Sequence, residues 1–308
     1  MGCIAQEIEL VPKIHILLTY NCSLRCKHCY VFSDQRAPGK ISLSQISRFL
    51  NDGRKIPGIE WVIFGGGEPF TQYPLLLKAV QRARKLDFQV GVETNGYFAR
   101  TEAAGIRLLR PLAAMGVKDL RISNDFLHYQ NPETSPANKA IIAAQKLGIP
   151  TTLLHVSSPG AIDPVQFAAR TAPNIEEPRF MFTGRAAELF ADHFPTFEPT
   201  SFNSCPRTDL ANPERVYVDA YGFVQICPGI AIGNACQTPL NEIITNYDIE
   251  KHDILRELDQ HGPSGYMEAT RLKTEERYVD ACHACYSARK CLLDQYPDLL
   301  GPRHVYGY

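Results

Sequence analysis

The chain has 308 residues, of which 44% are apolar, and its formal net charge is −1. This length accommodates one large barrel-type domain, or a domain of about 200 residues followed by a smaller one. A charge so close to zero gives no indication of a nucleic-acid partner. No apolar run approaches the roughly 20 residues of a membrane span, and the N-terminus lacks the regions of a signal peptide. We therefore expect a cytoplasmic protein with no membrane partner.

Over about the first 190 residues, short apolar segments typical of strands alternate with segments typical of helices. Ser42 stands where a helix N-cap is expected, and Pro74 opens the next helix. Pro111 is expected to kink a later helix, which Gly116 ends. Strands are expected at 14–20, 60–66, 89–96, 119–125, 150–157 and 177–184, and helices at 42–52, 74–86, 101–116, 135–148, 164–171 and 185–191.

Six successive β–α units predict an α/β fold with a parallel sheet, because crossover helices are what join parallel neighbours. Six units are too few to close a full eight-stranded barrel. We expect a partial (β/α)6 barrel that resembles a TIM barrel, with an open doubly wound sheet as the alternative. In both folds the functional residues lie at the carboxyl ends of the strands.

A segment rich in Pro, Ser and Thr, residues 193–204, marks the expected domain boundary. We therefore divide the chain into residues 1–192 and 193–308. Beyond the boundary, a β-hairpin is expected, with strands at 215–220 and 223–227 and a turn at Tyr221 and Gly222. Helical segments are expected at about 240–259 and 266–278.

The cysteines occur in two groups, and the first group is a C-x3-C-x2-C loop directly after the first expected strand. It contains Cys22, Cys26 and Cys29. A closed zinc site needs a fourth ligand, and the nearest candidates, His28 and His15, are poorly placed for that role. Three thiolates can instead hold a [4Fe–4S] cluster with one iron left open for a substrate or cofactor.

A glycine run, "GGGEP" at 65–69, follows the second expected strand. Together with the three-cysteine loop, it resembles the motifs of the radical S-adenosylmethionine (radical SAM) enzymes. The resemblance covers roughly residues 10–190. The residue before the last cysteine is usually aromatic in that family, and here it is His28.

The resemblance implies a [4Fe–4S] cluster on the first three cysteines and S-adenosylmethionine (SAM) bound beside it. Reductive cleavage of SAM would give a 5′-deoxyadenosyl radical, with the electron supplied by a donor of the flavodoxin or ferredoxin type. Ten residues are considered for the cofactor site, and Asn124 is one of them. For the polar residues among them, the alternative is a role in a turn or as a helix cap. The expected cofactor-binding residues are His28, Gly65, Gly66, Gly67, Glu68, Thr94, Asn95, Ser123 and Asp125.

The second group of cysteines resembles the C-terminal SPASM/Twitch extension of the same superfamily. The pattern stops short of a full SPASM set, since position 295 is Gln. We therefore expect one auxiliary [4Fe–4S] cluster, with a structural zinc knuckle as the alternative. Cys236 and Cys291 are left over, and either is a candidate hydrogen donor to a substrate radical. The expected ligands of the auxiliary cluster are Cys205, Cys227, Cys282 and Cys285.

These features predict an enzyme that takes a hydrogen from an unactivated C–H bond, giving epimerisation or dehydrogenation. Only about 13 residues precede the first expected strand, too few for a winged-helix peptide-recognition domain. The substrate is therefore expected to be a small polar molecule, or a peptide bound without such a domain. One alternative is a maturase of ribosomally made peptides that forms thioether or carbon crosslinks. Another is a non-enzymatic zinc or iron–sulfur protein.

Overall fold

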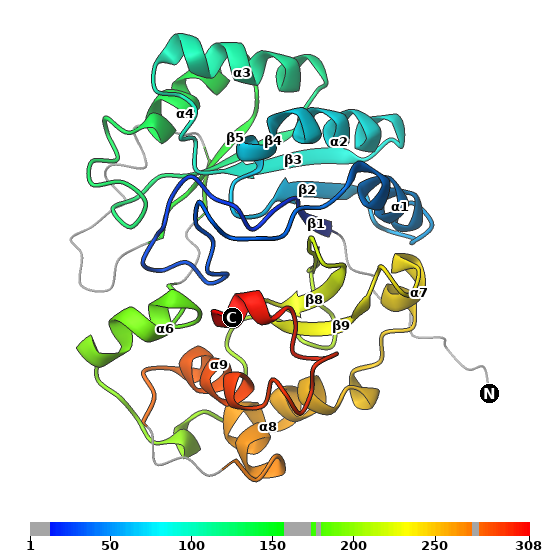
Figure 1. Cartoon of the computed structure of the whole chain (residues 1–308), viewed down its shortest axis with the longest axis vertical. Coiled ribbons are helices and arrows are strands. Elements are labelled where there is room, and N and C mark those ends of the chain that lie inside the picture. The colour runs from blue at the N-terminus through cyan, green and yellow to red at the C-terminus, as the bar shows by residue number, and fades with distance from the viewer. Residues whose placement is uncertain (1–12, 157–173, 177–179, 273–276) are drawn as a thin grey trace.

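A computed structural model describes residues 13–156, 174–176, 180–272 and 277–308. Its centre is a nine-stranded sheet in the order β6-β5-β4-β3-β2-β1-β7-β8-β9 (Figure 1). Strands β6 to β1 are parallel to one another, and β7 pairs in parallel with β1. Strand β8 is antiparallel to β7, and β9 is antiparallel to β8. The expectation of an α/β fold with a partial parallel barrel is confirmed.

The elements follow the expected order closely through the first five strands. The strands are β1 (Lys13–Leu17), β2 (Trp61–Gly65), β3 (Gln89–Thr94), β4 (Asp119–Ser123), β5 (Thr151–Leu154), β6 (Asn174–Glu176), β7 (Arg215–Val218), β8 (Phe223–Cys227) and β9 (Ile230–Asn234). The helices are α1 (Leu43–Gly53), α2 (Tyr73–Lys85), α3 (Glu102–Ala114), α4 (Pro136–Lys146), α6 (Arg185–Phe190), α7 (Leu240–Thr245), α8 (Asp253–Ala269) and α9 (Ala281–Cys291).

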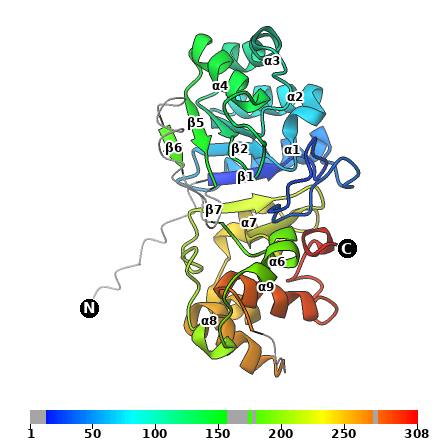
Figure 2. The same ribbon diagram turned by 90° about the vertical axis from the view of Figure 1, so that its left-hand side faces the viewer.

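Helices α1 to α4 cover one side of strands β1 to β5 (Figures 1 and 2). Their starts are set locally: Ser42 forms a capping box with Gln45, and Thr101 and Ser135 each accept a backbone N–H of the first turn. The apolar faces of these helices pack on buried strand residues such as Ile16 and Phe64. This packing places the other face of the sheet toward the C-terminal third of the chain.

The hairpin of β7 and β8 continues the sheet, because β7 pairs in parallel with β1. Buried Asp219 ties the hairpin to the end of β1: its carboxylate accepts hydrogen bonds from the Tyr20 hydroxyl and the Gln225 amide, each at 2.9 Å. It also accepts the backbone N–H groups of Tyr221 and Phe223. The turn at Tyr221 and Gly222 is confirmed, whereas the division of the chain at residue 192 remains a prediction.

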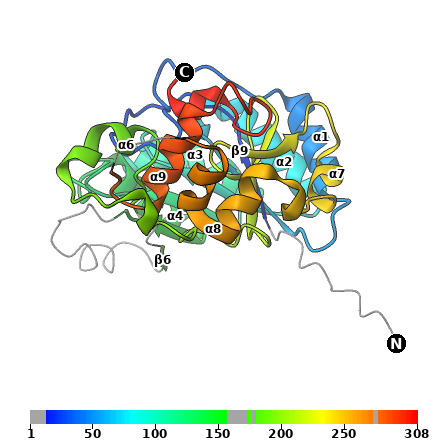
Figure 3. The same ribbon diagram turned by 90° about the horizontal axis from the view of Figure 1, so that it is seen from below.

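Helices α8 and α9 lie side by side beyond the hairpin (Figures 2 and 3). They form a second apolar core with residues that include Leu258, Tyr266 and Ala284. The helical segments expected at about 240–259 and 266–278 are wrong in extent. The observed breaks fall instead between α7 and α8 and at Gly262, whose non-helical φ of 66° and ψ of −168° divide α8 into two helical stretches.

One further expectation differs from the structure. The sixth strand lies at Asn174–Glu176, before the aromatic run that predicted it, and residues 180–184 form no strand. Pro111 lies inside α3, which continues past it to Ala114, and the kink expected there remains a prediction. The helix expected at 164–171 lies outside the described residues. Among the described residues, no helix is long and apolar enough to cross a membrane.

We expect Asp219→Ala to lower the free energy of unfolding by about 3 kcal/mol, because it leaves two buried donors without an acceptor at about 1–3 kcal/mol each, and two part-buried backbone donors as well. Urea unfolding followed by circular dichroism measures the change. Asp294→Ala is the matched control, since Asp294 is exposed and forms a surface ion pair with Arg303. Equal unfolding midpoints for the two variants would show that Asp219 does not hold the hairpin.

Candidate functional site

A cavity of about 940 Å³ lies at the carboxyl ends of the parallel strands. Such a volume is typical of a site for an organic ligand, for which about 300–1,000 Å³ is usual. Cys22, Cys26 and Cys29 line one part of this cavity, and Cys227 and Cys282 line another. The fold therefore brings members of both cysteine groups to a single cavity, although about 180 residues separate them in the sequence.

The three-cysteine loop is held in place by the start of α6. Arg185, only 5% exposed, donates from Nε to the Cys26 carbonyl at 2.9 Å and from Nη2 to the Ser33 carbonyl at 2.5 Å. Its backbone N–H donates to the Cys29 carbonyl. Gly184 has a φ of 58°, and a Cβ there would lie 2.5 Å from the same carbonyl. The loop thus depends on a residue pair far away in the sequence.

The side chains of this loop are of the type that holds a [4Fe–4S] cluster. Burial, together with the neighbouring thiols, raises the pKa of Cys22 and of Cys26 to about 12. Among the described residues, no three His, Cys, Asp or Glu side chains are grouped closely enough for one metal ion. A cubane cluster binds each thiolate through a different iron, so three neighbouring but separated thiols around a cavity fit a cluster.

The glycine run packs directly against the chain that leads into the cysteine loop. A Cβ on Gly66 would lie 2.4 Å from the Thr19 carbonyl oxygen, and a Cβ on Gly67 would lie 2.5 Å from the carbonyl oxygens of Tyr20 and Asn21. Gly67 and Gly65 exchange backbone hydrogen bonds with the same stretch. Gly66 and Gly67 line the cavity, whereas Gly65 does not. Its missing side chain leaves room for a histidine of β1.

Glu68 is fully buried and does not line the cavity. Its carboxylate accepts hydrogen bonds from the Thr94 hydroxyl and from the backbone N–H groups of Phe70 and Asn95. Burial raises the pKa of Glu68 to about 7, and these three donors oppose that shift. The Asn95 side chain in turn donates to the Cys22 sulfur at 3.5 Å. In this position Glu68 joins the loops after β2 and β3, and its role at the cofactor remains a prediction.

Thr94, Asn95 and Ser123 line the cavity, whereas Asp125 is fully buried and does not line it. The Asp125 carboxylate contacts the His128 ring nitrogen at 2.9 Å and accepts the backbone N–H of Val156. Burial acts to raise the pKa of Asp125. His128 and these hydrogen bonds outweigh that effect and lower the pKa to about 2. His128 lies edge-on to His28, with ring centres 4.6 Å apart. Both rings line the cavity beside the cysteine loop.

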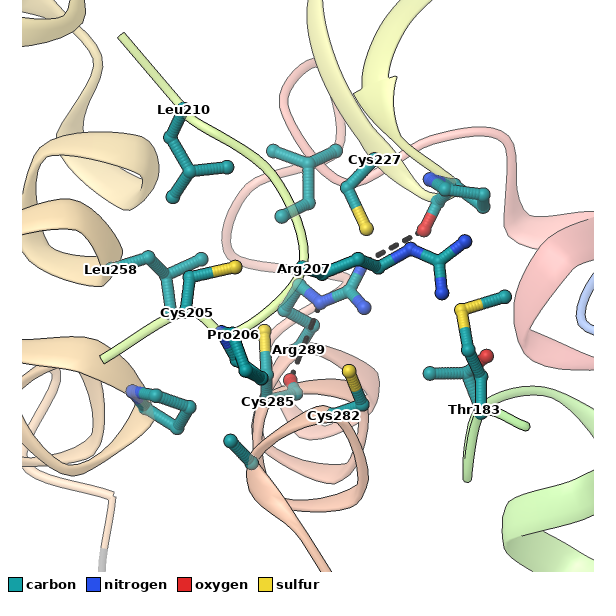
Figure 4. A pocket seen from close by; sticks show the side chains of 15 residues that line it. Thr183, Cys205, Pro206, Arg207, Leu210, Cys227, Leu258, Cys282, Cys285 and Arg289 are labelled. Carbon is teal, nitrogen blue, oxygen red and sulfur yellow. Dashed lines mark hydrogen bonds between the residues drawn. The ribbon is translucent and has the colours of Figure 1, made fainter. Parts of the chain in front are cut away.

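A second, smaller cavity contains the four cysteines expected to hold the auxiliary cluster. Figure 4 shows the sulfur atoms of Cys205, Cys227, Cys282 and Cys285 turned toward its middle. Its volume of about 30 Å³ is far below that of a usual organic-ligand pocket. Arg289, 1% exposed, lines it and donates to the carbonyls of Pro228 and Cys285. Four converging thiols in a small cavity suit an inorganic group.

Cys236 and Cys291 are exposed, and neither lines either cavity. The Cys236 sulfur instead accepts a hydrogen bond from Gln45 on α1. Cys291 is the last residue of α9. Cys282 and Cys285, which line the smaller cavity, lie near the start of the same helix. The structure therefore does not bring these candidate hydrogen donors to the site.

Several residues around the large cavity have no counterpart among the sequence-based expectations. They come from the strands themselves: His15 on β1, Glu93 on β3, Arg121 on β4 and Tyr217 on β7. The sequence offered one signal for these residues, because they are polar positions inside otherwise apolar strands. When the rest of a strand is packed in the core, such a position often faces a cavity. Arg185 carries no such signal, since its contacts are all distant in the sequence.

A partial β/α barrel with a three-thiol loop at its strand ends is similar to known proteins, and the comparisons support one superfamily. Residues 16–163 match the model of the radical SAM superfamily. The tungsten-containing aldehyde ferredoxin oxidoreductase cofactor-modifying protein of Pyrococcus furiosus is 30% identical over 136 residues, 44% of this chain and 36% of that protein. The mycofactocin maturase MftC of Mycobacterium tuberculosis is 28% identical over 193 residues, 58% of this chain and 47% of the relative. The matched segments thus span less than half of each relative. Together, the matches support a relation of this chain to the radical SAM superfamily.

Solved structures share the fold at low identity. SuiB of Streptococcus suis bound to its precursor peptide SuiA matches with a TM-score of 0.59 and 14% identity, over 89% of this chain and 76% of that one. The enzyme anSMEcpe with bound AdoMet and a Cp18Cys peptide matches with a TM-score of 0.53 and 13% identity, over 96% and 98% of the two chains. The likeness to SuiB and anSMEcpe concerns the fold.

We expect Arg185→Met to loosen the three-cysteine loop, because it removes two hydrogen bonds from a charged donor, each contributing about 1.5–3 kcal/mol. Hydrogen–deuterium exchange of peptides covering residues 22–34, in protein without iron, should become faster. Arg48→Met is the matched control, since Arg48 is exposed on α1 and stacks on Phe49. Unchanged exchange in the loop would show that Arg185 does not order it.

Proposed function

We propose that this chain is a radical SAM enzyme that modifies a peptide, with an auxiliary iron–sulfur cluster opposite the SAM site. The observation that carries the proposal is the single cavity of about 940 Å³ lined by cysteines of both groups. A substrate in this cavity would lie between two metal centres. A cavity of this size has room for SAM and for one or two residues of a peptide.

Cys22, Cys26 and Cys29 would hold the first [4Fe–4S] cluster, and the backbone of Gly66 and Gly67 would face SAM. When bound, these groups supply a 5′-deoxyadenosyl radical that takes a hydrogen atom from a substrate C–H bond. The protein orients the substrate and excludes water. His28 and Ser123 border the same space, and we assign them to the nucleoside part of SAM.

Cys205, Cys227, Cys282 and Cys285 would hold the auxiliary cluster. Their convergence on one small cavity supports this ligand set over one that includes Cys291. Four thiolates would occupy every iron, which suits electron transfer rather than substrate binding. An electron donor of the flavodoxin or ferredoxin type would serve the first cluster.

A peptide substrate is favoured over the small polar molecule expected from the length of the chain. The relatives include a mycofactocin maturase and a putative peptide biosynthesis protein, YydG of Bacillus subtilis. SuiB and anSMEcpe, which share the fold, carry bound peptides in their structures. Epimerisation that uses Cys236 or Cys291 as hydrogen donor has no support from their exposed positions. We therefore favour an oxidative modification, a crosslink or a dehydrogenation.

Protein purified without oxygen is expected to contain about eight iron atoms with matching sulfide, the content of two cubane clusters. Cys26→Ser should lose about half of the iron and all SAM cleavage, whereas Cys282→Ser should lose the other half. Cys236→Ser is the matched control and should keep the full content, because Cys236 lines neither cavity. Zinc without sulfide would overturn the proposal.

The substrate class is tested by the rate of 5′-deoxyadenosine formation. A mixture of peptides of random sequence should accelerate it, whereas a mixture of aminoglycosides should not. The reverse result would restore the small polar substrate.

A further inference from the structure

Five polar side chains line the deeper part of the large cavity, on four strands of the sheet. His15 and Tyr217 lie side by side on the paired strands β1 and β7, with ring centres 5.2 Å apart. Glu93 and Arg121 are paired on β3 and β4. Arg215 is the first residue of β7. His15 lies two residues before the end of β1, so this group is deeper in the barrel than the cysteine loop.

His15 is 3% exposed, and neither of its ring nitrogens has a hydrogen-bond partner among the described residues. A buried polar side chain without a partner is costly. The site is nevertheless built around this ring, because a Cβ on Gly65 would lie 2.3 Å from its Nε2 atom. Burial, aided by the charges of Arg215 and Arg121, lowers the pKa of His15 to about 3. The imidazole is therefore neutral and offers one donor and one acceptor.

Arg215 adds a positive charge to this part of the cavity. Within the described ranges, no hydrogen bond or ion pair joins its guanidinium to another side chain, in contrast to Arg121, which pairs with Glu93 and Asp119. Three further carboxylates line the cavity, and none of them pairs with Arg215: Asp209, Glu214 and Asp280. The cavity thus contains a cation whose planar donor fork matches a carboxylate.

We propose that Arg215 and His15, with the Tyr217 hydroxyl beside them, form a subsite for a carboxylate of the substrate. The inference rests on the proposed function, since it takes the occupant of the cavity to be a peptide. The guanidinium would pair with the carboxylate, and the imidazole N–H would donate to it. The carboxylate belongs either to an acidic side chain or to the C-terminus of the peptide. Bound there, it fixes the neighbouring C–H bonds between the two cysteine groups.

Three probes of nearly equal size separate these sources by isothermal titration calorimetry on anaerobically purified protein. N-acetylglutamic acid α-amide carries a side-chain carboxylate, N-acetylglutamine a terminal carboxylate, and N-acetylglutamine amide none. We expect one of the first two to bind about tenfold more tightly than the third, as one charged hydrogen-bonded pair provides. The preferred probe identifies the source.

Arg215→Met should abolish that preference, Arg215→Lys should retain part of it, and His15→Phe should reduce it severalfold. Arg107→Met is the matched control, since Arg107 is exposed on α3, and it should bind as the unmodified protein does. Circular dichroism checks that each variant folds. Equal affinity for the three probes, no binding of any of them, or a preference that survives Arg215→Met would each overturn the subsite.

The test needs neither SAM nor reductant. If the protein contains zinc without sulfide but prefers a probe with a carboxylate, the proposed function is wrong and the carboxylate subsite stands. A protein with full iron content and no preference would overturn the subsite alone.

Discussion

The parallel pairing of β1 with β7 is the contact on which the arrangement of the site depends. β1 leads into the loop with the first three cysteines, and β7 begins the hairpin that ends at Cys227. Main-chain hydrogen bonds between these two strands therefore set the distance between the two cysteine groups. Asp219 reinforces the pairing from the loop side, because it binds Tyr20 and the hairpin turn together. A change in register here would move every cysteine of one group relative to the other.

Around the first cysteine group, geometry is set by backbone packing and by one buried carboxylate. The glycine run lies against the main chain of Thr19 to Asn21, where any side chain would collide. Glu68 joins that run to Thr94 and Asn95, and Asn95 reaches Cys22. Since these groups are buried and fully hydrogen-bonded, the loops behave as one rigid unit. These hydrogen bonds between loops help to fix the position of the cysteine loop.

Helix starts and most strands could be predicted from the sequence alone, because local signals specify them. Ser42 and Pro74 mark helix starts correctly, and period and apolarity locate the first five strands. The sixth strand was misplaced because its three residues, Asn174–Glu176, are too few to give a strand pattern, while the nearby aromatic run gives one. The pairing of β7 with β1 and the contacts of Arg185 are non-local, so no window of sequence reveals them. Both groups of cysteines were recognised, but the hydrogen bonds of Glu68 and the position of His15 beside Tyr217 depend on contacts that only the fold creates.

Burial of the cysteine thiols also affects their reactivity in the chain without a metal centre. With a pKa raised to about 12, the thiols of Cys22 and Cys26 stay protonated at pH 7. The thiolate is the form that reacts with oxidants and other thiols. These two thiols would therefore react slowly with oxidants and resist disulfide formation. The burial that packs the loop thus also protects two of its cysteines chemically.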